Sequence, residues 1–293
     1  LRLGAVVVEH NPLYTAHELA GMFADHGARV AIAWDASVAK LPPLDHVIAV
    51  NLLDAFPPLK RRALALPVKK LRETRARLHA DAPGATPWKT ALKGSKLAAS
   101  HPRPSVDDLA VIQYTSGTTG HFKGAMLTHL NLYANALQGA AWMKDAVDGR
   151  EVSYALLPMF HAFGMTLYLT FGLLKRSRLV LFPTFDVDMV LDAAKKSPPT
   201  IYCAVPPIYD KTARRAAERG ISLKTAKFCI SGAMALTDEI VNRWESVSGG
   251  LLVEGYGLTE SSPVALGNPF WPTRRTGTIG VPFPSTLMRV VDP

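Results

Sequence analysis

The stretch Leu109-Ala-Val-Ile-Gln-Tyr-Thr-Ser-Gly-Thr-Thr-Gly-His-Phe-Lys-Gly124 joins an apolar, strand-like run to a loop rich in glycine, serine and threonine. A helical pattern begins shortly after the loop, near Thr128. Open α/β sheets place ligand sites at such strand ends, and a glycine-rich loop leading into a helix is suited to binding anions. The stretch therefore predicts an α/β protein with an anion site at the end of one strand.

Apolar, β-branched runs alternate with helical patterns along the whole chain. The strand-like runs cover residues 3–8, 30–34, 46–50, 109–114, 152–157, 178–182, 200–205, 227–231 and 251–254. Between them we expect helices, one of which starts at a capping box formed by Thr15 and Glu18 and another of which is capped by Asp186. Strands that alternate with helices form right-handed βαβ units, so we expect a mostly parallel sheet covered on both faces.

The composition is that of a globular protein with anionic partners. The chain has 293 residues, of which 48% are hydrophobic and 19% are charged, which excludes a disordered chain and allows about two domains. Its longest apolar stretch, Ala162–Leu174, is shorter than the ~20 residues that a membrane span needs. The net charge of +9 favours nucleotides, membrane head groups or nucleic acid as partners. The two cysteines, Cys203 and Cys229, are expected to be core residues.

The two ends of the chain indicate a piece of a longer cytoplasmic protein. Leu1 is not a methionine, and the chain opens directly on a strand-like run. Residues 287–293 form another strand-like run that is cut short, and no secretory signal precedes the first strand.

A basic segment interrupts the alternation of strands and helices within residues 57–100. Eight basic residues lie close together with the single acid Glu73: Lys60, Arg61, Arg62, Lys69, Lys70, Arg72, Arg75 and Arg77. One interpretation is a solvated, partly disordered insertion. The other is an interfacial helix attracted to anionic lipid, which would place the protein peripherally at the inner face of the membrane.

Three further segments carry candidate site residues. His161 lies in Leu157-Pro-Met-Phe-His-Ala-Phe-Gly164, and Glu254-Gly-Tyr-Gly-Leu-Thr-Glu-Ser261 offers an aromatic ring for a base and an oxygen ligand for Mg²⁺ at Glu260. Ser231-Gly-Ala-Met234 follows another strand. In the first loop, Gly117, Gly120 and Gly124 allow close approach to an anion, four hydroxyls can donate, and Lys123 adds positive charge. That loop lacks the Gly-Lys pair of a Walker A loop.

In this order, these motifs resemble those of the adenylate-forming superfamily, which includes acyl-CoA synthetases, luciferases and peptide-synthetase adenylation domains. Asn11-Pro-Leu-Tyr-Thr15, the basic segment and Pro87-Trp88 make the chain most similar to long-chain fatty acyl-CoA ligases. The resemblance covers essentially the whole chain.

The resemblance implies two αβ subdomains with mostly parallel sheets, leading into a truncated β-barrel. The first would cover residues 1–146, with the basic insertion 57–100 and the phosphate loop 114–124, and the second residues 147–268. Residues 269–293 would start the barrel, and the C-terminal lid domain with its catalytic lysine would be absent. The same comparison implies a fatty acid or other carboxylic acid as substrate, ATP, Mg²⁺ and CoA as cofactors or co-substrates, a possible homodimer and no nucleic acid.

The resemblance also assigns site residues one by one. Catalytic roles are implied for Lys123, His161, Thr259 and Glu260. ATP binding is implied for Thr115, Ser116, Gly117, Thr118, Thr119, Gly120, Lys123, Gly232, Ala233, Glu254, Gly255, Tyr256, Gly257 and Thr259. The metal would be held by Thr118 and Glu260. The acyl pocket would be formed by Phe160, His161, Gly164, Met165, Gly232 and Met234.

The implied function is ATP-dependent formation of an acyl-adenylate, followed by transfer of the acyl group to CoA, with the 293 residues alone expected to be inactive. Phe122 stands where the family usually has proline, and Met165 stands where some long-chain relatives have a gate tryptophan. The alternatives are an aryl, short-chain or amino-acid-activating enzyme, and a non-catalytic basic module that binds membranes or nucleic acid. No acid lies in Phe228–Thr237 to pair with an ammonium group, and Met234 within that stretch is apolar, which favours a hydrocarbon substrate.

Overall fold

The computed structural model describes residues 1–115 and 122–292. The chain divides into two compact units. The large unit contains residues 1–9 and 103–293, and the small unit contains residues 10–102. The subdomain boundaries expected after residues 146 and 268 stay predictions.

A seven-stranded sheet forms the centre of the large unit, in the order β13-β12-β11-β10-β9-β7-β8. Five strands run parallel: β7 (Val152–Ala155), β8 (Arg178–Leu181), β9 (Ile201–Ala204), β10 (Phe228–Ser231) and β11 (Leu252–Gly257). Two antiparallel strands, β12 (Val264–Gly267) and β13 (Val281–Pro282), extend the sheet beyond β11. The predicted α/β class with a mostly parallel sheet is confirmed. The described residues after 268 form no closed barrel.

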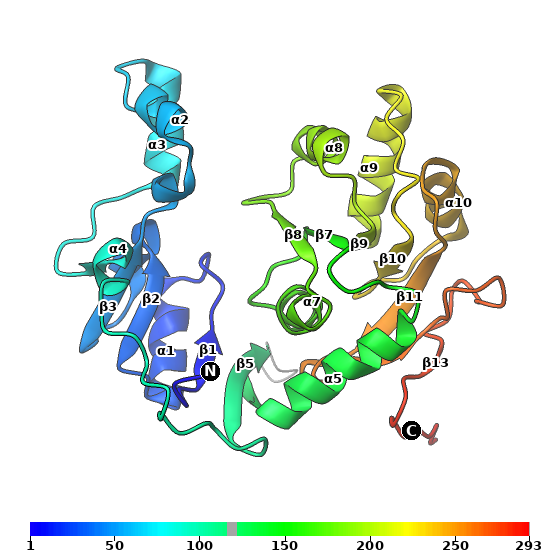
Figure 1. Ribbon diagram of the computed structural model, residues 1–293, viewed down its shortest axis with the longest axis horizontal. Helices are drawn as coiled ribbons and strands as arrows, with labels where there is room; N and C mark the ends of the chain where they lie inside the picture. Colours follow the sequence, from blue (N-terminus) through cyan, green and yellow to red (C-terminus); the bar gives the residue numbers. More distant parts are fainter. Residues whose placement is uncertain (116–121, 293) are drawn as a thin grey trace. The chain divides into compact units, whose positions relative to one another are not determined.

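Helices cover both faces of this sheet (Figure 1). On one face, α8 (Val187–Lys196), α9 (Pro206–Glu218) and α10 (Asp238–Val247) enclose a core that contains Tyr202, Tyr209 and Trp244. On the other face lie α5 (His129–Trp142) and a continuous apolar helical segment made of α6 (Ala162–Gly164), the π-helical η3 (Met165–Thr170) and α7 (Phe171–Leu174). The cap expected at Asp186 is present, because its side chain accepts the N–H of Met189. The helix expected near Thr128 begins there, and the Thr128 side chain accepts the N–H of Asn131. Both cysteines are buried, as expected.

A second sheet of the large unit joins the start of the chain to its middle. It contains β1 (Val7–Glu9), β5 (Leu109–Thr115) and β6 (Lys123–Thr128) in the order β1-β5-β6. β1 pairs in parallel with β5, and β6 pairs antiparallel to β5. The sequence predicted a first strand from Leu3 and no strand at 123–128. Both points were wrong, since residues 1–6 lie outside the strand and residues 123–128 form β6 beside β5.

The small unit has a three-stranded parallel sheet in the order β2-β3-β4. Its strands are β2 (Val30–Trp34), β3 (His46–Val50) and β4 (Thr86–Pro87), and its first helix is α1 (Ala16–His26) with the predicted capping box at Thr15. Short helices η1 (Asp35–Lys40), η2 (Leu52–Ala55) and α4 (Trp88–Ala91) follow individual strands.

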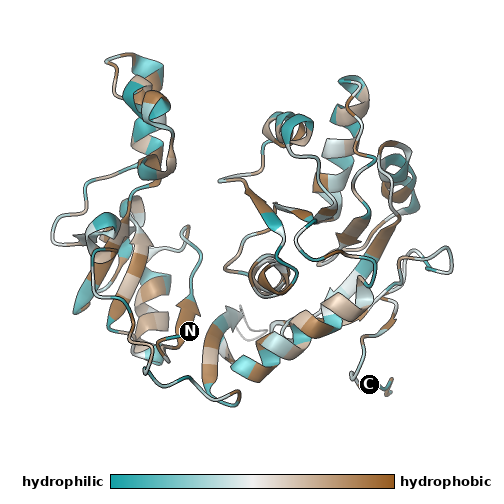
Figure 2. Ribbon diagram, in the orientation of Figure 1, coloured by the Kyte–Doolittle hydropathy of each residue, from teal (hydrophilic) through white to brown (hydrophobic). Residues whose placement is uncertain are grey.

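The basic segment of the small unit forms two helices, α2 (Pro58–Leu64) and α3 (Lys69–Leu78). Both helices carry hydrophilic residues interspersed with hydrophobic ones (Figure 2), and Leu64 is the buried residue that anchors α2. The helical alternative of the sequence analysis is therefore the one that the structure supports, while contact with a membrane stays a prediction. None of the helices within residues 1–115 and 122–292 has the length and apolar character needed to span a bilayer.

Candidate active site

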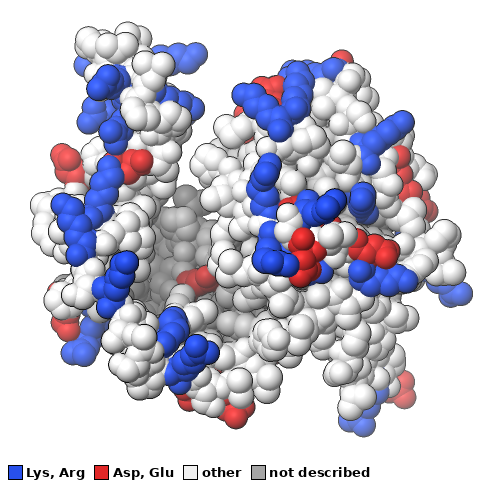
Figure 3. Space-filling view, viewed as in Figure 1, with Lys and Arg blue, Asp and Glu red and all other residues white. Residues whose placement is uncertain are grey.

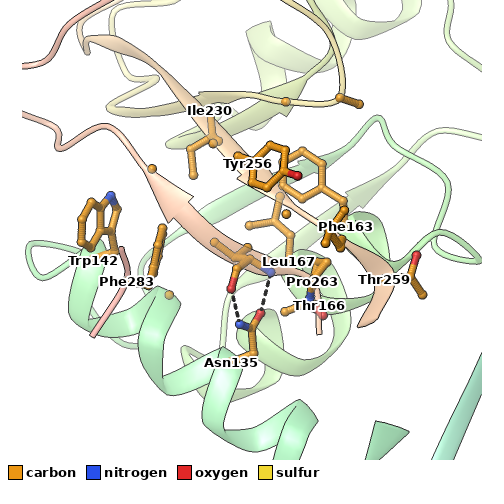
Figure 4. A pocket seen from close by; sticks show the side chains of 18 of the residues that line it. Asn135, Trp142, Phe163, Thr166, Leu167, Ile230, Tyr256, Thr259, Pro263 and Phe283 are labelled. Atoms are coloured by element: carbon orange, nitrogen blue, oxygen red, sulfur yellow. Dashed lines mark hydrogen bonds between the residues drawn. The ribbon is translucent and has the colours of Figure 1, made fainter. Parts of the chain in front are cut away.

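A cavity of about 750 Å³ lies at the carboxyl ends of β10 and β11, where open parallel sheets bind their ligands. One wall is formed by β11, β12 and the turn between them, and the facing wall by α5 and the segment 161–171 (Figure 4). The cavity belongs entirely to the large unit.

Eleven of the predicted site residues line this cavity. They are Thr115, Lys123, His161, Gly232, Ala233, Glu254, Gly255, Tyr256, Gly257, Thr259 and Glu260. Four segments that are far apart in sequence thus meet at one place. Ser116, Gly117, Thr118, Thr119 and Gly120 lie outside the described residues.

Four residues expected in the acyl pocket are not part of the described lining: Phe160, Gly164, Met165 and Met234. Met165 is 3% exposed and packs in a core with Val111 and Leu127 instead. At Gly164 a Cβ would lie 2.1 Å from the carbonyl oxygen of Pro158, so this glycine serves close packing of the backbone. Met234 is 57% exposed to solvent.

Lys123 brings a cation to the cavity because it starts β6 opposite the last residue of β5, Thr115. The hydroxyl of Thr115 donates to the carbonyl of Lys123 over 3.5 Å. This pairing fixes both residues at the two ends of the phosphate-loop stretch.

His161 is the N-cap of α6, and its Nδ1 accepts the backbone N–H of Phe163 at 3.3 Å. Desolvation by its surroundings lowers the pKa of His161 below its ordinary value. The ring is therefore neutral at pH 7, with Nδ1 as acceptor and Nε2–H as the remaining donor. A neutral donor can orient an anionic group without forming a fixed ion pair with it.

The residues at the ends of β10 and β11 are closely packed where they line the cavity. A Cβ on Gly232 would lie 3.2 Å from the ring of Phe163 and 3.3 Å from the carbonyl oxygen of Gly255, so these segments approach closely. Ala233 has a φ of +66°, the left-handed region that an L-residue occupies at a cost. Strained backbone held at a strand end is typical of binding sites, and it lies here beside the exposed ring of Tyr256.

Glu254 organises the loops around the cavity. One oxygen of its carboxylate accepts the N–H of Gly277 at 2.7 Å, and the other accepts that of Leu236 at 3.4 Å. The backbone of Glu254 accepts in addition the N–H of Asn268 at 2.8 Å. The carboxylate of Glu254 thus accepts hydrogen bonds from backbone amides. Glu260 is the other acidic residue of the described lining, and it can interact with a ligand at the cavity mouth.

Glu260 lies in the short helix η4 (Thr259–Ser261) and is exposed to solvent beside Thr259. Within the described residues no group of three or more His, Cys, Asp or Glu could by itself enclose a metal. One carboxylate with hydroxyl neighbours fits Mg²⁺, which commonly keeps waters and substrate phosphates as its other ligands. Glu260 is the described residue that would hold such an ion.

The sequence analysis missed the wall opposite the strand ends. Asn135 is 3% exposed and makes two hydrogen bonds to the backbone of Val264 (Figure 4). Its Nδ2 donates to the carbonyl of Val264 at 2.8 Å, and its Oδ1 accepts the N–H of Val264 at 3.2 Å. Further along α5, the rings of Trp142 and Phe283 stack with centroids 4.2 Å apart. The spacing of Asn135, Gly139 and Trp142 on one face of the helix was the available signal, but it does not reveal which sheet edge that face meets.

The comparisons with known proteins identify the family of the chain. The family model described as AMP-binding enzyme matches residues 1–293. A long-chain-fatty-acid–CoA ligase of Bacillus subtilis is 36% identical over 97% of this chain and 51% of its own length. The crystal structure of ATP-bound MatB from Rhodopseudomonas palustris has a TM-score of 0.68 at 27% identity and covers 97% of this chain and 50% of that one. The anthranilate CoA ligase AuaEII, in complex with anthranoyl-AMP, has a TM-score of 0.81 at 22% identity, over 99% of this chain and 52% of that one.

The chain therefore has an α/β fold and belongs to the AMP-binding enzyme family. Its relatives are curated acyl-CoA ligases, and the chain spans about half the length of those that it matches.

Proposed function

We propose that the whole protein to which this chain belongs activates a long-chain fatty acid with ATP and then transfers it to CoA. The observation that carries the proposal is one cavity with two chemically different ends. Thr259 lies at one end and Trp142 and Phe283 lie at the other (Figure 4), and Lys123 and Glu260 add charge to the lining. A polar phosphate and an apolar chain can thus be held side by side.

The reaction proceeds in two displacements. An oxygen of the fatty acid carboxylate attacks the α-phosphorus of ATP, the bond to the β-phosphate bridge breaks, and pyrophosphate leaves. The sulfur of CoA then attacks the carbonyl carbon, AMP leaves with the bonding pair, and the thiol proton passes to a base or to solvent. No side chain forms a covalent bond in either step, so the enzyme contributes position and charge.

The residues of the cavity divide this work. Lys123 neutralises the phosphates, and neutral His161 donates a hydrogen bond to the carboxylate before it reacts. The ring of Tyr256 stacks on the adenine, next to the backbone of Gly232 and Gly255. Glu260 would hold Mg²⁺, which supplies further charge to the leaving pyrophosphate when it is bound.

Long-chain substrates are favoured over the aryl, short-chain and amino-acid alternatives by the walls of the cavity. Phe163, Leu167, Phe171, Ile230 and Val253 add apolar surface beyond His161. The carboxylate of Glu254 is bound by two backbone amides and is not directed at a substrate ammonium. The identity to the long-chain ligase of Bacillus subtilis supports the same choice.

ATP–pyrophosphate exchange by the whole protein, with carboxylic acids of graded length, tests the proposal. We expect Lys123→Ala and Glu260→Ala each to lower exchange by at least ~100-fold, about 2.7 kcal/mol of transition-state stabilisation. Lys144→Ala and Glu239→Ala are matched controls, because Lys144 lies over the ring of Trp271 and Glu239 is 72% exposed beside Arg243. Exchange at the wild-type rate in both cavity variants would refute the site assignment, and a preference for aryl acids would refute the substrate class.

The remaining partners are part of the same proposal. CoA is the acyl acceptor, the protein works in the cytoplasm, and two copies can associate as a homodimer. The 293 residues alone are expected to form no acyl-CoA, because the relatives that do so are about twice as long.

The basic helices α2 and α3 bring the protein to anionic membranes. If so, binding to vesicles requires anionic lipid and weakens as salt rises through the screening range. Equal binding to neutral vesicles, or binding to neither kind, would contradict this contact and leave the basic segment as a solvated surface.

A further inference from the structure

A second cavity, of about 290 Å³, lies wholly within the small unit. It is bounded by η2, α2 and the C-terminal end of α3, and it has no part in the site described above. Three arginines line it, Arg61 and Arg62 from α2 and Arg75 from α3, together with His79 and Asn51. Figure 3 shows several lysine and arginine side chains on the surface of these two helices.

The positive charge of this cavity is not balanced within it. Asp54 is the one acidic residue among the described residues of its lining. That carboxylate is already shared, since Lys89 Nζ lies 2.6 Å and Arg61 Nη1 lies 3.5 Å from its Oδ1. The guanidinium groups of Arg62 and Arg75 make no hydrogen bond or ion pair with any part of the chain that the structure describes. Two guanidinium groups, each a rigid donor of several hydrogen bonds, therefore line the cavity without a partner among the described residues.

A buried carboxylate orients the histidine of the cavity, which is an independent observation. Asp35 is 4% exposed, and its Oδ2 is bound to Nδ1 of His79 while its Oδ1 accepts the N–H of Ala80 at 3.2 Å. The end of α3 is fixed in addition by Trp34, whose Nε1 donates to the carbonyl of Leu78 at 3.1 Å. With Nδ1 engaged on Asp35, Nε2 is the ring atom of His79 left for the cavity.

Asn51 adds a neutral donor. Its Oδ1 accepts the N–H of Leu53 at 2.9 Å, so the amide is oriented by its own turn and its Nδ2 group remains to donate. The cavity thus offers guanidinium and amide donors, with Nε2 of His79 beside them. This donor set matches an oxyanion with several acceptor oxygens.

We propose that this cavity of the small unit binds a phosphate group. The group is presented either by a soluble phosphate monoester or by the head group of an anionic phospholipid such as phosphatidic acid. Arg62 and Arg75 bind it in forked fashion, and the Nδ2 group of Asn51 donates to a third oxygen. The proposal does not depend on the ligase activity.

Titration calorimetry of the purified protein with inorganic phosphate tests the pocket directly. Arg62→Ala and Arg75→Ala are each expected to weaken binding about tenfold or more, with partial recovery in the lysine variants, which keep the charge but lose the fork. Arg72→Ala and Arg77→Ala are matched controls, since they remove the same charge from α3 at positions outside the cavity. Far-UV circular dichroism shows that each variant is folded.

Vesicles of phosphatidylcholine with and without phosphatidic acid distinguish the two sources. If the cavity variants lose both phosphate binding and vesicle binding while the control variants keep both, the ligand is the lipid head group. Loss of phosphate binding alone, with vesicle binding unchanged, indicates a soluble phosphate. Equal weakening of phosphate binding in all four alanine variants would overturn the pocket in favour of a diffuse basic surface, and so would no phosphate binding by the unaltered protein.

Discussion

His10 and His26 of the small unit face each other with 3.2 Å between their Nε2 atoms, and His10 stacks on Phe23. Burial, followed by the charge of His26, lowers the pKa of His10 to about 4. Burial also lowers the pKa of His26. Both rings are therefore neutral in the folded protein at a pH where the unfolded chain already takes up protons.

We expect the stability of the small unit to fall as the pH drops from about 6.5 towards 4. In this window the unfolded state binds more protons than the folded state, so protonation favours unfolding. The loss from His10 is of the order of 1 kcal/mol once solvent screening of this partly exposed ring is allowed for. Urea unfolding between pH 4 and pH 7 measures it. His10→Gln should flatten the profile, whereas the exposed His17→Gln should not; an unchanged profile in His10→Gln would contradict the assignment.

Among the residues of the candidate site, the sequence predicted the polar ones better than the apolar ones. Lys123, Glu254 and Glu260 belong to motifs in which polar residues follow a strand. Such residues indicate a binding site even in a single sequence. Met165 and Met234 were assigned to the acyl pocket from their positions in motifs alone. An apolar side chain fits a core, a pocket wall or the surface equally well in sequence, and only packing separates these cases, as the burial of Met165 and the exposure of Met234 show.

Among the elements, α10 and β11 are joined to the segment after β12 by one nearly buried ion pair. Arg274 is bound to both carboxylate oxygens of Glu245, and its Nη1 also donates to the carbonyl of Leu252 at 2.8 Å. Glu245 in turn accepts the N–H of Leu252 at 2.7 Å. The side chains of Arg274 and Glu245 are only 13% and 24% exposed, so neither charge would be well solvated alone.

Arg274→Ala is therefore expected to destabilise the large unit by about 3 kcal/mol, because it leaves Glu245 buried without its partner. Arg214→Ala should cost less than ~1 kcal/mol, since Arg214 is 55% exposed where it pairs with Asp210 on α9. Chemical unfolding monitored by tryptophan fluorescence compares them, as Trp244 lies in the adjoining core. Equal losses in the two variants would show that burial does not determine the strength of these pairs.

The elements that the sequence predicted are those fixed by local signals. The capping box at Thr15 and the cap at Asp186 gave the starts of α1 and α8 to within a residue. β6 and β12 were not predicted, because each is defined by antiparallel pairing with a neighbouring strand and carries little alternation of its own. Such strands depend on their neighbours, and cross-strand partners are not visible in a single sequence.

At the scale of the whole molecule, the two units differ in the depth of their cores. All four residues of β9 are buried at the centre of the large sheet, whereas no residue of β3, the central strand of the small sheet, is fully buried. Amide protection follows burial and local contact density.

We expect the amides of β3 to exchange with solvent deuterium at least ~10-fold faster than those of β9, because the small unit opens more readily. Native-state hydrogen exchange read by mass spectrometry measures both peptides in one sample. Peptides from β10, which is also central in the large sheet, are the internal control and should behave like β9. Equal protection of β3 and β9 would mean that the units unfold together.

The parallel pairing of β1 with β5, in which Val7 lies opposite Val111, has a consequence for how the chain is made. A ribosome releases β1 long before β5, and the small unit, residues 10–102, emerges in between. If that unit folds as it emerges, it shortens the loop that the pairing must close, and loop closure costs less for shorter loops. Val7 and Val8 meanwhile remain without their partner strand, so β1 is a segment on which a chaperone would act until residue 115 has been made.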